Sequence, residues 1–270
     1  MTTVDTAQLE EKVKDLYRQI ARHPRGNFHF PLGLALAERL GYPERWLREV
    51  PPGAVESFAG VGYFFDLADL RPGEHVLDLG SGAGMDAFVA ARLVGPAGRV
   101  TGVDITAEQL DKARRLASEA GITNIEFVEG RIEDLPVADA SFDAVISNGV
   151  INLSADKPRV FTEAARALRR GGRLVVADIV TERHLKESIV ADAELWAACI
   201  GGAAQQETYR HDVEAAGLGI ETIRENEYEF LSHQARGASA TYGVKSISLL
   251  TIKPRTQAVP PPAPDRRRSS

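Results

Sequence analysis

Val76-Leu-Asp-Leu-Gly-Ser-Gly-Ala-Gly84 carries the clearest structural signal in the chain, because a buried-strand pattern runs directly into three glycines at alternate positions. The apolar residues before the glycines are typical of a parallel strand that is buried on both faces. The next segment, Met85–Val94, is a predicted helix. Residues without a Cβ permit a sharp turn and a close ligand, and the free N–H groups at the start of the helix point toward that ligand. The segment therefore predicts a strand, a ligand-binding loop and a helix.

The spacing of the glycines departs from the dinucleotide fingerprint G-x-G-x-x-G. Gly80, Gly82 and Gly84 alternate, and Met85 occupies the position of the third fingerprint glycine. Asp78 lies at the strand end just before the turn, where its charge would repel a pyrophosphate and attract an ammonium group. These features favour a ligand with a cationic amino group over NAD. An oxidoreductase and a plain strand-to-helix turn are the alternatives.

Four further runs of β-branched and apolar residues predict the other parallel strands. They are Arg99–Asp104, Ile125–Val128, Phe142–Ser147 and Arg173–Asp178. In an open, doubly wound α/β sheet the carboxyl ends of the strands face one crevice, where ligands bind. An acid at the end of the second strand, here Asp104, accepts hydrogen bonds from ribose hydroxyls in such folds.

Later segments complete the expected sheet. Gly217–Tyr228 and Val244–Ile252 predict antiparallel strands, which give a mostly parallel seven-stranded sheet with helices on both faces. Thr106 is the expected N-cap of a helix over Ala107–Ala120. Ser188–Ala203 is expected to form one helix that carries a tryptophan and the single cysteine.

Five motifs, LDLGSGAG, GVD, EGRIEDLP, FDAVISN and LRRGGRL, resemble in order and spacing the class I S-adenosylmethionine-dependent methyltransferases, from about Pro72 to Val180. The resemblance implies a Rossmann-like fold and S-adenosylmethionine as the cofactor. It also implies a set of cofactor contacts, which are Asp78, Gly80, Ser81 and Gly82 at the methionine part, Asp104 at the ribose, Ile105 and Ile132 on either side of adenine, Glu133 at its amine, and the Asn148 carbonyl at the amino group. Alternatively, Ile105 and Ile132 are core residues, and Asp134 replaces Glu133 as the adenine contact.

A narrower resemblance covers about Tyr42 to Ala203. The segments LGYPERWLREVPPGAVESFAGVG, VISNGVINLSADKPRVFTEAARALRRGGRL and DAELWAACIGGA are similar to the arsenite methyltransferases, which hold trivalent arsenic with thiolates because a soft ion prefers sulfur. Val61 and Gly149 stand where that family has two of its cysteines, and Cys199 alone remains. One thiolate does not chelate, so we expect an acceptor other than arsenite, for which Val61 and Gly149 leave space. Arsenite methylation is the alternative, and Cys199 is expected to be a small buried hydrophobe.

Composition narrows the function classes. The chain has 270 residues and a net charge of −6, which argues against a nucleic-acid substrate because affinity for phosphate backbones needs a basic surface. Asn148-Gly-Val-Ile also lacks the Pro-Pro-aromatic motif that base-methylating enzymes have at this place. No run approaches the roughly 18 apolar residues of a membrane span, and one cysteine allows no internal disulfide. We expect a cytoplasmic protein without a metal site, and assign no oligomeric state.

Three regions are expected along the chain. Residues 1–50 form a helical cap or lid, residues 51–253 the methyltransferase domain, and residues 254–270 a disordered tail rich in proline and arginine. The segment Val4–Arg22 has helical apolar spacing, at Leu9, Val13, Leu16 and Ile20. Such helices cover the cofactor in small-molecule methyltransferases, which makes Tyr17 a candidate cofactor contact. Alternatively, the helices only cap the sheet.

The expected chemistry is methyl transfer to a small-molecule acceptor by in-line displacement. The sulfonium is already activated, so the protein mainly holds the nucleophile in line and excludes water. A general base is needed only for an acceptor proton of high pKa, and His23 and His29 are the candidates, with structural roles as the alternative. Asn148 and Asn152 are candidates to orient the acceptor. The methylated atom stays open, and a binding protein without turnover is the alternative function.

Overall fold

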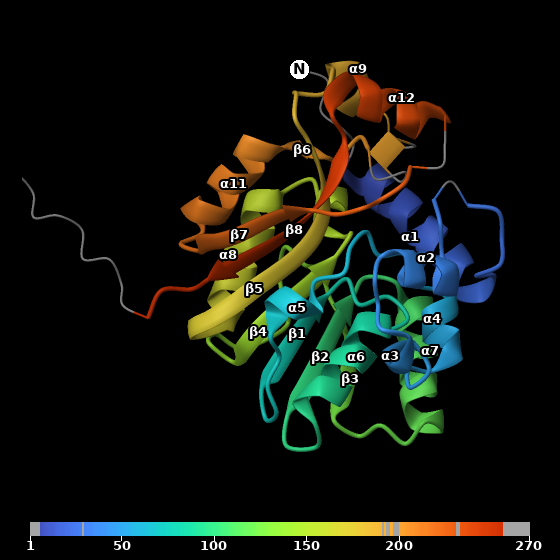
Figure 1. Cartoon of the computed structure of the whole chain (residues 1–270), viewed down its shortest axis with the longest axis vertical. Coiled ribbons are helices and arrows are strands. Elements are labelled where there is room, and N and C mark those ends of the chain that lie inside the picture. The colour runs from blue at the N-terminus through green and yellow to red at the C-terminus, as the bar shows by residue number, and fades with distance from the viewer. Residues whose placement is uncertain are drawn as a thin grey trace, which may run out of the picture.

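A computed structural model describes residues 6–28, 30–190, 192, 195–196, 200–230 and 233–255. An eight-stranded sheet runs through the centre of the molecule (Figure 1). Its strand order is β3-β2-β1-β4-β5-β8-β7, and β6 pairs with β5 beside this path. The expected doubly wound α/β fold is confirmed. The sheet has one strand more than the seven expected, because the two residues of β6 (Ala204–Gln205) pair with the end of β5.

Parallel strands make up one side of the sheet and antiparallel strands the other. Apart from the two-residue β6, the parallel strands are β1 (His75–Leu79), β2 (Arg99–Asp104), β3 (Ile125–Glu129), β4 (Phe142–Asn148) and β5 (Leu168–Thr181). β8 (Lys245–Ile252) lies antiparallel to β5, and β7 (Gly219–Glu225) lies antiparallel to β8. Because β1 lies between β2 and β4, the strand order reverses at β1, which is where open sheets of this kind form ligand crevices.

Two apolar cores lie on opposite faces of the sheet. Side chains alternate between them, so Val76 belongs to one core and Leu77 to the other. The first core includes residues of α6 (Met85–Val94) and α7 (Ala107–Glu119). It also includes residues of the five N-terminal helices. These are α1 (Thr6–Arg22), α2 (Gly33–Arg39), α3 (Glu44–Leu47), α4 (Pro52–Glu56) and α5 (Phe65–Ala68). The second core is formed with α8 (Lys157–Ala167) and α11 (Gln206–Ala215).

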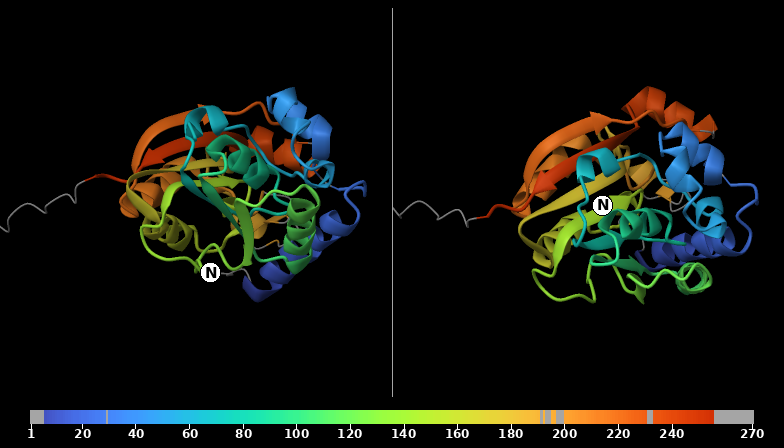
Figure 2. Two further views of the ribbon diagram at one scale, coloured as in Figure 1. Left: turned by 90° about the horizontal axis from the view of Figure 1, so that it is seen from below. Right: turned by 60° about the horizontal axis from the view of Figure 1, so that its bottom comes forward.

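The N-terminal helices lie at the same end of the sheet as α12 (His233–Tyr242), as Figure 2 shows in blue and orange-red. Arg39 of α2 pairs with Glu229, which precedes α12, at 2.9 Å. The helix expected over Val4–Arg22 is confirmed from Thr6 onward, with Leu9, Val13 and Ile20 buried. Val4 and Asp5 lie outside the described residues.

The largest differences from the expected elements fall in two places. β5 begins at Leu168 rather than at Arg173, because Leu168 pairs with Phe142 and the Gly171 amide donates to the Lys253 carbonyl. The single helix expected over Ser188–Ala203 is wrong. The helix α9 (Glu187–Val190) is followed by the non-helical residue Asp192, and Gly201 and Gly202 form a turn. That turn lies against Trp196, whose ring leaves no room for a Cβ on Gly201.

Candidate functional site

Two adjoining cavities lie at the carboxyl ends of β1, β2 and β4. One, which we call the loop cavity, has a volume of about 90 Å³ and lies against the glycine-rich turn. The other, the edge cavity, has a volume of about 290 Å³ and extends past the end of β2. Their shared lining residues are Val13, Gly80, Asp104, Ile105, Val150 and Leu153. The two cavities therefore form one elongated site at the reversal of strand order.

The glycine-rich turn is shaped by close packing as well as by its backbone. Gly84 has a φ of +91°, and a Cβ there would lie 2.7 Å from Cζ of Phe127. It thus supplies the close helix-to-strand approach that the third glycine of a dinucleotide fingerprint supplies one position later. A Cβ on Gly80 would lie 2.6 Å from Cβ of Val150. Both positions therefore need glycine.

Asp104 is oriented by two backbone amides. Gly82 donates to its Oδ2 at 2.9 Å and Thr106 donates to its Oδ1 at 2.8 Å. The expected N-cap position of Thr106 is confirmed, but its side chain makes no cap hydrogen bond, and the Asp104 carboxylate accepts from the helix start instead. Burial raises the pKa of Asp104, and these amide hydrogen bonds oppose that rise. The carboxylate is therefore fixed at the junction of the two cavities.

Three buried oxygen atoms on the wall of the loop cavity have no hydrogen-bond partner among the described residues. They are Oδ2 of Asp78, Oγ of Ser81 and Oε1 of Gln109. Asp78 is only 2% exposed, and burial, followed by the charges of Asp86 and Asp104, raises its pKa well above the ordinary value. Buried polar atoms in folded proteins are almost always hydrogen-bonded. The cavity therefore matches a ligand that brings hydrogen-bond donors and positive charge.

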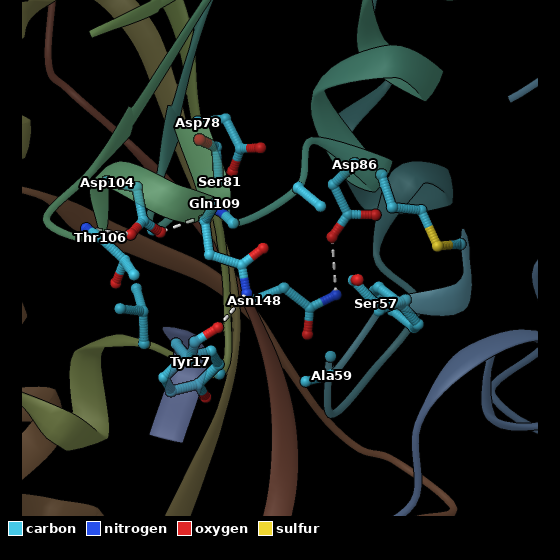
Figure 3. A pocket seen from close by; sticks show the side chains of 18 of the residues that line it. Tyr17, Ser57, Ala59, Asp78, Ser81, Asp86, Asp104, Thr106, Gln109 and Asn148 are labelled. Carbon is cyan, nitrogen blue, oxygen red and sulfur yellow. Dashed lines mark hydrogen bonds between the residues drawn. The ribbon is translucent and has the colours of Figure 1, made fainter. Parts of the chain in front are cut away.

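A buried network joins the loop cavity to the N-terminal region, and Figure 3 shows its hydrogen bond between Asn148 and Asp86. Tyr42 donates to Oδ1 of Asp86 at 2.6 Å, and Nδ2 of Asn148 donates to Oδ2 of Asp86 at 2.9 Å. Burial raises the pKa of Asp86 to about 6, although both hydrogen bonds oppose the rise. Asp86 was not among the expected site residues, although an acid in the first turn of the mostly apolar α6 was a signal for it.

The two asparagines expected to orient an acceptor have structural partners instead. Asn148 lines the loop cavity, but its Oδ1 accepts from the Val61 amide at 2.7 Å while its Nδ2 is bound to Asp86. Its side chain thus holds the loop that precedes Gly62. Asn152 is fully buried, lines neither cavity and is oriented to donate from Nδ2 to the Gly149 carbonyl at 3.0 Å. Asn152 therefore does not face an acceptor.

The histidines do not supply a base within the described site. His23 is exposed just after α1 and lines neither cavity, because the chain turns there, with the Gly26 amide donating to the His23 carbonyl at 2.9 Å. The structure therefore places His23 outside the lining of both cavities. His29 lies outside the described residues. Among the residues that the structure describes, no histidine lines either cavity.

The residues expected at an adenine lie together in the edge cavity. Ile105, Ile132 and Glu133 line it, and Oε1 of Glu133 accepts from Oγ of Ser154 at 2.5 Å. Asp134, the alternative to Glu133, is exposed and lies outside the lining. The structure brings the expected cofactor residues onto the walls of the two cavities, namely Tyr17, Asp78, Gly80, Ser81, Gly82, Asp104, Ile105, Ile132, Glu133 and Asn148.

Helix α1 covers the junction of the cavities. Val13 lines both cavities, and Tyr17 lines the loop cavity. The helix is fastened to α7 by ion pairs of Arg18 and Arg22 with Glu108, each at 3.0 Å. It is fastened again by Nε2 of Gln109, which donates to the Tyr17 carbonyl at 3.0 Å. Helix α1 thus forms part of the site wall as well as covering the sheet.

Val61 and Gly149 are neighbours beside the loop cavity. Gly149 has a φ of +75°, and a Cβ there would lie 3.3 Å from Cγ1 of Val61. Val61 is 1% exposed and lines neither cavity, so the expectation that it leaves space is wrong, since its methyl groups fill that space. Gly149 does line the loop cavity. Cys199 lies outside the described residues.

Within the described part of the chain, no three side chains of His, Cys, Asp or Glu are arranged to hold a metal ion. No helix in that part has the length and apolar character needed to cross a membrane.

Comparison with known proteins places the same segments in one family. A family described as "Methyltransferase domain" matches residues 70–217. Arsenite methyltransferases from Halobacterium salinarum and Aquipseudomonas alcaligenes are 40% and 42% identical over 198 and 172 residues, which cover 73% and 61% of this chain but 50% and 49% of those proteins. The chain thus spans about half the length of these curated relatives.

A solved structure gives a similar result. The arsenic(III) S-adenosylmethionine methyltransferase from Chlamydomonas reinhardtii is 31% identical, with a TM-score of 0.62, and the match covers 84% of this chain and 76% of that one. The matched family covers all five parallel strands and the loops after them, so the similarity falls on the segments that form most of the cavity walls. The chain belongs to the class I S-adenosylmethionine-dependent methyltransferases.

Proposed function

We propose that the chain transfers a methyl group from S-adenosylmethionine to a small, uncharged organic acceptor. When bound, the cofactor supplies a methyl group that is already activated on a sulfonium. The observation that carries the donor assignment is the set of three unpartnered buried oxygens around one glycine-rich turn, on Asp78, Ser81 and Gln109. A ligand with an ammonium group and a positively charged sulfur offers the donors and the charge that these atoms lack.

The residues of the elongated site divide between the parts of the donor. In this proposal Asp104 accepts from the ribose hydroxyls, since its carboxylate is already held by two amides at the cavity junction. Ile105 and Ile132 provide apolar surface for adenine, and Glu133 lies beside them. The buried carboxyl of Asp78 favours the ammonium end.

The acceptor class follows from the wall of the loop cavity. Its described lining contains no Lys, Arg, His or Cys side chain, and it does contain the carboxyls of Asp78 and Asp86. An anionic acceptor would lose hydration there without gaining a cationic partner, which is costly. Arsenite would lack the thiolates that soft ions prefer, because the described lining contains no cysteine. The methyl groups of Val61 fill the space beside Gly149. An uncharged organic acceptor needs neither a cationic partner nor thiolate ligands.

Catalysis in this site rests on positioning. The described lining offers no histidine base, and α1 and the loop before Gly62 close two sides of the cavity. Holding a nucleophile in line and excluding water supplies roughly 7 to 11 kcal/mol of barrier reduction in well-oriented reactions. The proposal therefore needs an acceptor whose nucleophilic atom reacts without a histidine base.

The test uses labelled S-adenosylmethionine and matched pairs of acceptors that differ by one carboxylate and whose nucleophile carries no proton, such as pyridine and pyridine-3-carboxylate. We expect transfer to members of the uncharged series and little transfer to their anionic partners. A parallel reaction contains arsenite and glutathione. Methylated arsenic at a rate above that of the organic acceptors, or a preference for the anionic partners, would contradict the proposed acceptor class.

A variant at the acceptor side separates donor binding from transfer. Ala59 lines the loop cavity opposite Asp104 (Figure 3) and is half-buried. Ala59→Leu should lower methyl transfer while leaving the affinity for S-adenosylhomocysteine, the demethylated product, nearly unchanged. Equal loss of both would place Ala59 at the donor rather than at the acceptor.

A further inference from the structure

Gln109 connects the covering helix to the glycine-rich turn. It lies near the start of α7, is 1% exposed and lines the loop cavity. Its Nε2 donates to the backbone carbonyl of Tyr17 in α1 at 3.0 Å. This is a side-chain hydrogen bond to the backbone, so it depends on Gln109 alone and not on the identity of residue 17.

The other end of the same amide faces the cavity. Oε1 of Gln109 is buried and has no hydrogen-bond partner among the described residues. A Cβ on Gly82 would lie 4.0 Å from it, so the oxygen lies over the glycine-rich turn. Figure 3 shows the amide nitrogen directed at Tyr17 and the oxygen turned toward the middle of the pocket. A buried carbonyl in this position is ready to accept a hydrogen bond from a ligand.

We propose that Gln109 is a positioning residue that couples donor binding to the closure of α1, an inference that rests on the proposed function. An N–H or O–H group of the bound donor donates to Oε1 and selects the amide rotamer in which Nε2 reaches the Tyr17 carbonyl. The amide can satisfy both partners only in this orientation, because its single acceptor and its donors lie on opposite sides. By linkage, closure of α1 then strengthens donor binding by the factor by which the donor favours closure.

A neighbouring residue supplies the matched control. Glu108 pairs with Arg18 and Arg22 of α1 and yet lines neither cavity. Glu108→Gln therefore weakens the attachment of α1 without touching the ligand. Gln109→Leu removes both ends of the link. Gln109→Glu keeps an acceptor toward the cavity but removes the donor to Tyr17.

The experiment measures S-adenosylhomocysteine binding by calorimetry and hydrogen exchange of the α1 amides with and without saturating ligand, and it needs no acceptor. In the wild-type chain and in Glu108→Gln, ligand should slow α1 exchange about fivefold or more. Gln109→Leu should bind up to about tenfold more weakly and show no slowing at saturation. Gln109→Glu should keep the affinity within about threefold and also lose the slowing.

The outcomes separate the coupling from the function beneath it. Ligand-induced slowing of α1 exchange in both Gln109 variants at saturation would overturn the coupling, as would wild-type binding without any slowing. Failure of the wild-type chain to bind would overturn the proposed donor, and the coupling with it. Circular dichroism of each variant shows whether it is folded, and Gln109→Glu keeps the test open if the leucine variant is not.

Discussion

Three acidic side chains from different segments converge on the loop cavity. Asp78 is the penultimate residue of β1, Asp86 lies in the first turn of α6, and Asp104 ends β2. Burial is the first cause of the raised pKa of each. Such crowding of carboxyls is unfavourable in the empty cavity, and a cationic ligand relieves it. Binding of a cationic ligand should therefore lower the pKa values of these carboxyls.

Asp86 predicts a measurable dependence of stability on pH. Burial raises its pKa to about 6 from the ordinary value of 3.8, so the folded state holds this proton more tightly than the unfolded state. The stability linked to the proton is fully present below about pH 4 and is lost as pH rises through 6. Relative to wild type, Asp86→Asn should gain up to about 3 kcal/mol between pH 4 and 7, measured by urea unfolding.

Asp66 provides a control of opposite sign. Partial burial acts to raise its pKa, but the hydrogen bond and charge of Arg224 outweigh this and lower it. Its stabilising contribution is therefore present above the unfolded pKa and lost as pH falls, so Asp66→Asn should lose stability relative to wild type toward neutral pH. Parallel trends for the two variants would contradict the assignment for Asp86.

Asp104 carries the second prediction at this scale. Asp104→Ala should weaken the binding of S-adenosylhomocysteine by about 1.5 to 3 kcal/mol, the range for hydrogen bonds to a charged group, as measured by calorimetry. Asp134→Ala, at an exposed position outside the cavity lining, should leave the affinity unchanged. Unchanged binding by the Asp104 variant would exclude the ribose role.

Sequence reasoning about single residues succeeded where the pairing of parallel strands alone brings a residue to its partner. Asp78, Asp104 and the glycines lie at strand ends, so their convergence follows from parallel pairing alone. The importance of Asp86 and Gln109 depends on Tyr42 and on the Tyr17 carbonyl, which distant N-terminal segments bring to them. The apolar pattern of the helices does not encode those pairings.

Among the elements, α1 packs against the rest of the chain through an apolar face that its sequence predicted. Ile20 is fully buried near the end of this helix. Ile20→Ala should destabilise the chain by about 2 to 5 kcal/mol, because it leaves a cavity under α1, as measured by urea unfolding. Gln19→Ala, an exposed neighbour, should change the stability by less than about 0.5 kcal/mol. Similar values for both would mean that α1 is only loosely attached.

Element boundaries were the weaker part of the sequence analysis. The run Arg169 to Gly172 has the composition of a turn, yet it extends β5 because Lys253 exchanges backbone hydrogen bonds with Gly171 and Gly172. The segment after Glu187 has helical composition, yet it is interrupted at Asp192. In both places long-range backbone pairing or packing overrides local preference.

For the molecule as a whole, the doubly wound sheet and the place of the site were predictable, since β-α alternation and motif spacing specify such a sheet. The two-residue β6 was not, because pairing of so short a segment depends on where the end of β5 lies.

Ligand binding should stabilise the entire chain. At about 100 times its dissociation constant, S-adenosylhomocysteine should add about 2.7 kcal/mol to the free energy of unfolding. This corresponds to a rise in Tm of roughly 5 to 10 °C in scanning calorimetry. NAD at the same concentration should give no rise. A shift with NAD and none with S-adenosylhomocysteine would contradict the family's cofactor in this chain.

The contact between Val61 and Gly149 has an evolutionary consequence. In the proposed function, the carboxyls that bind the donor come from β1 and β2, whereas these two positions lie in the loops before α5 and after β4. Under that proposal, replacements at positions 61 and 149 can change the methyl acceptor and leave the donor contacts in place.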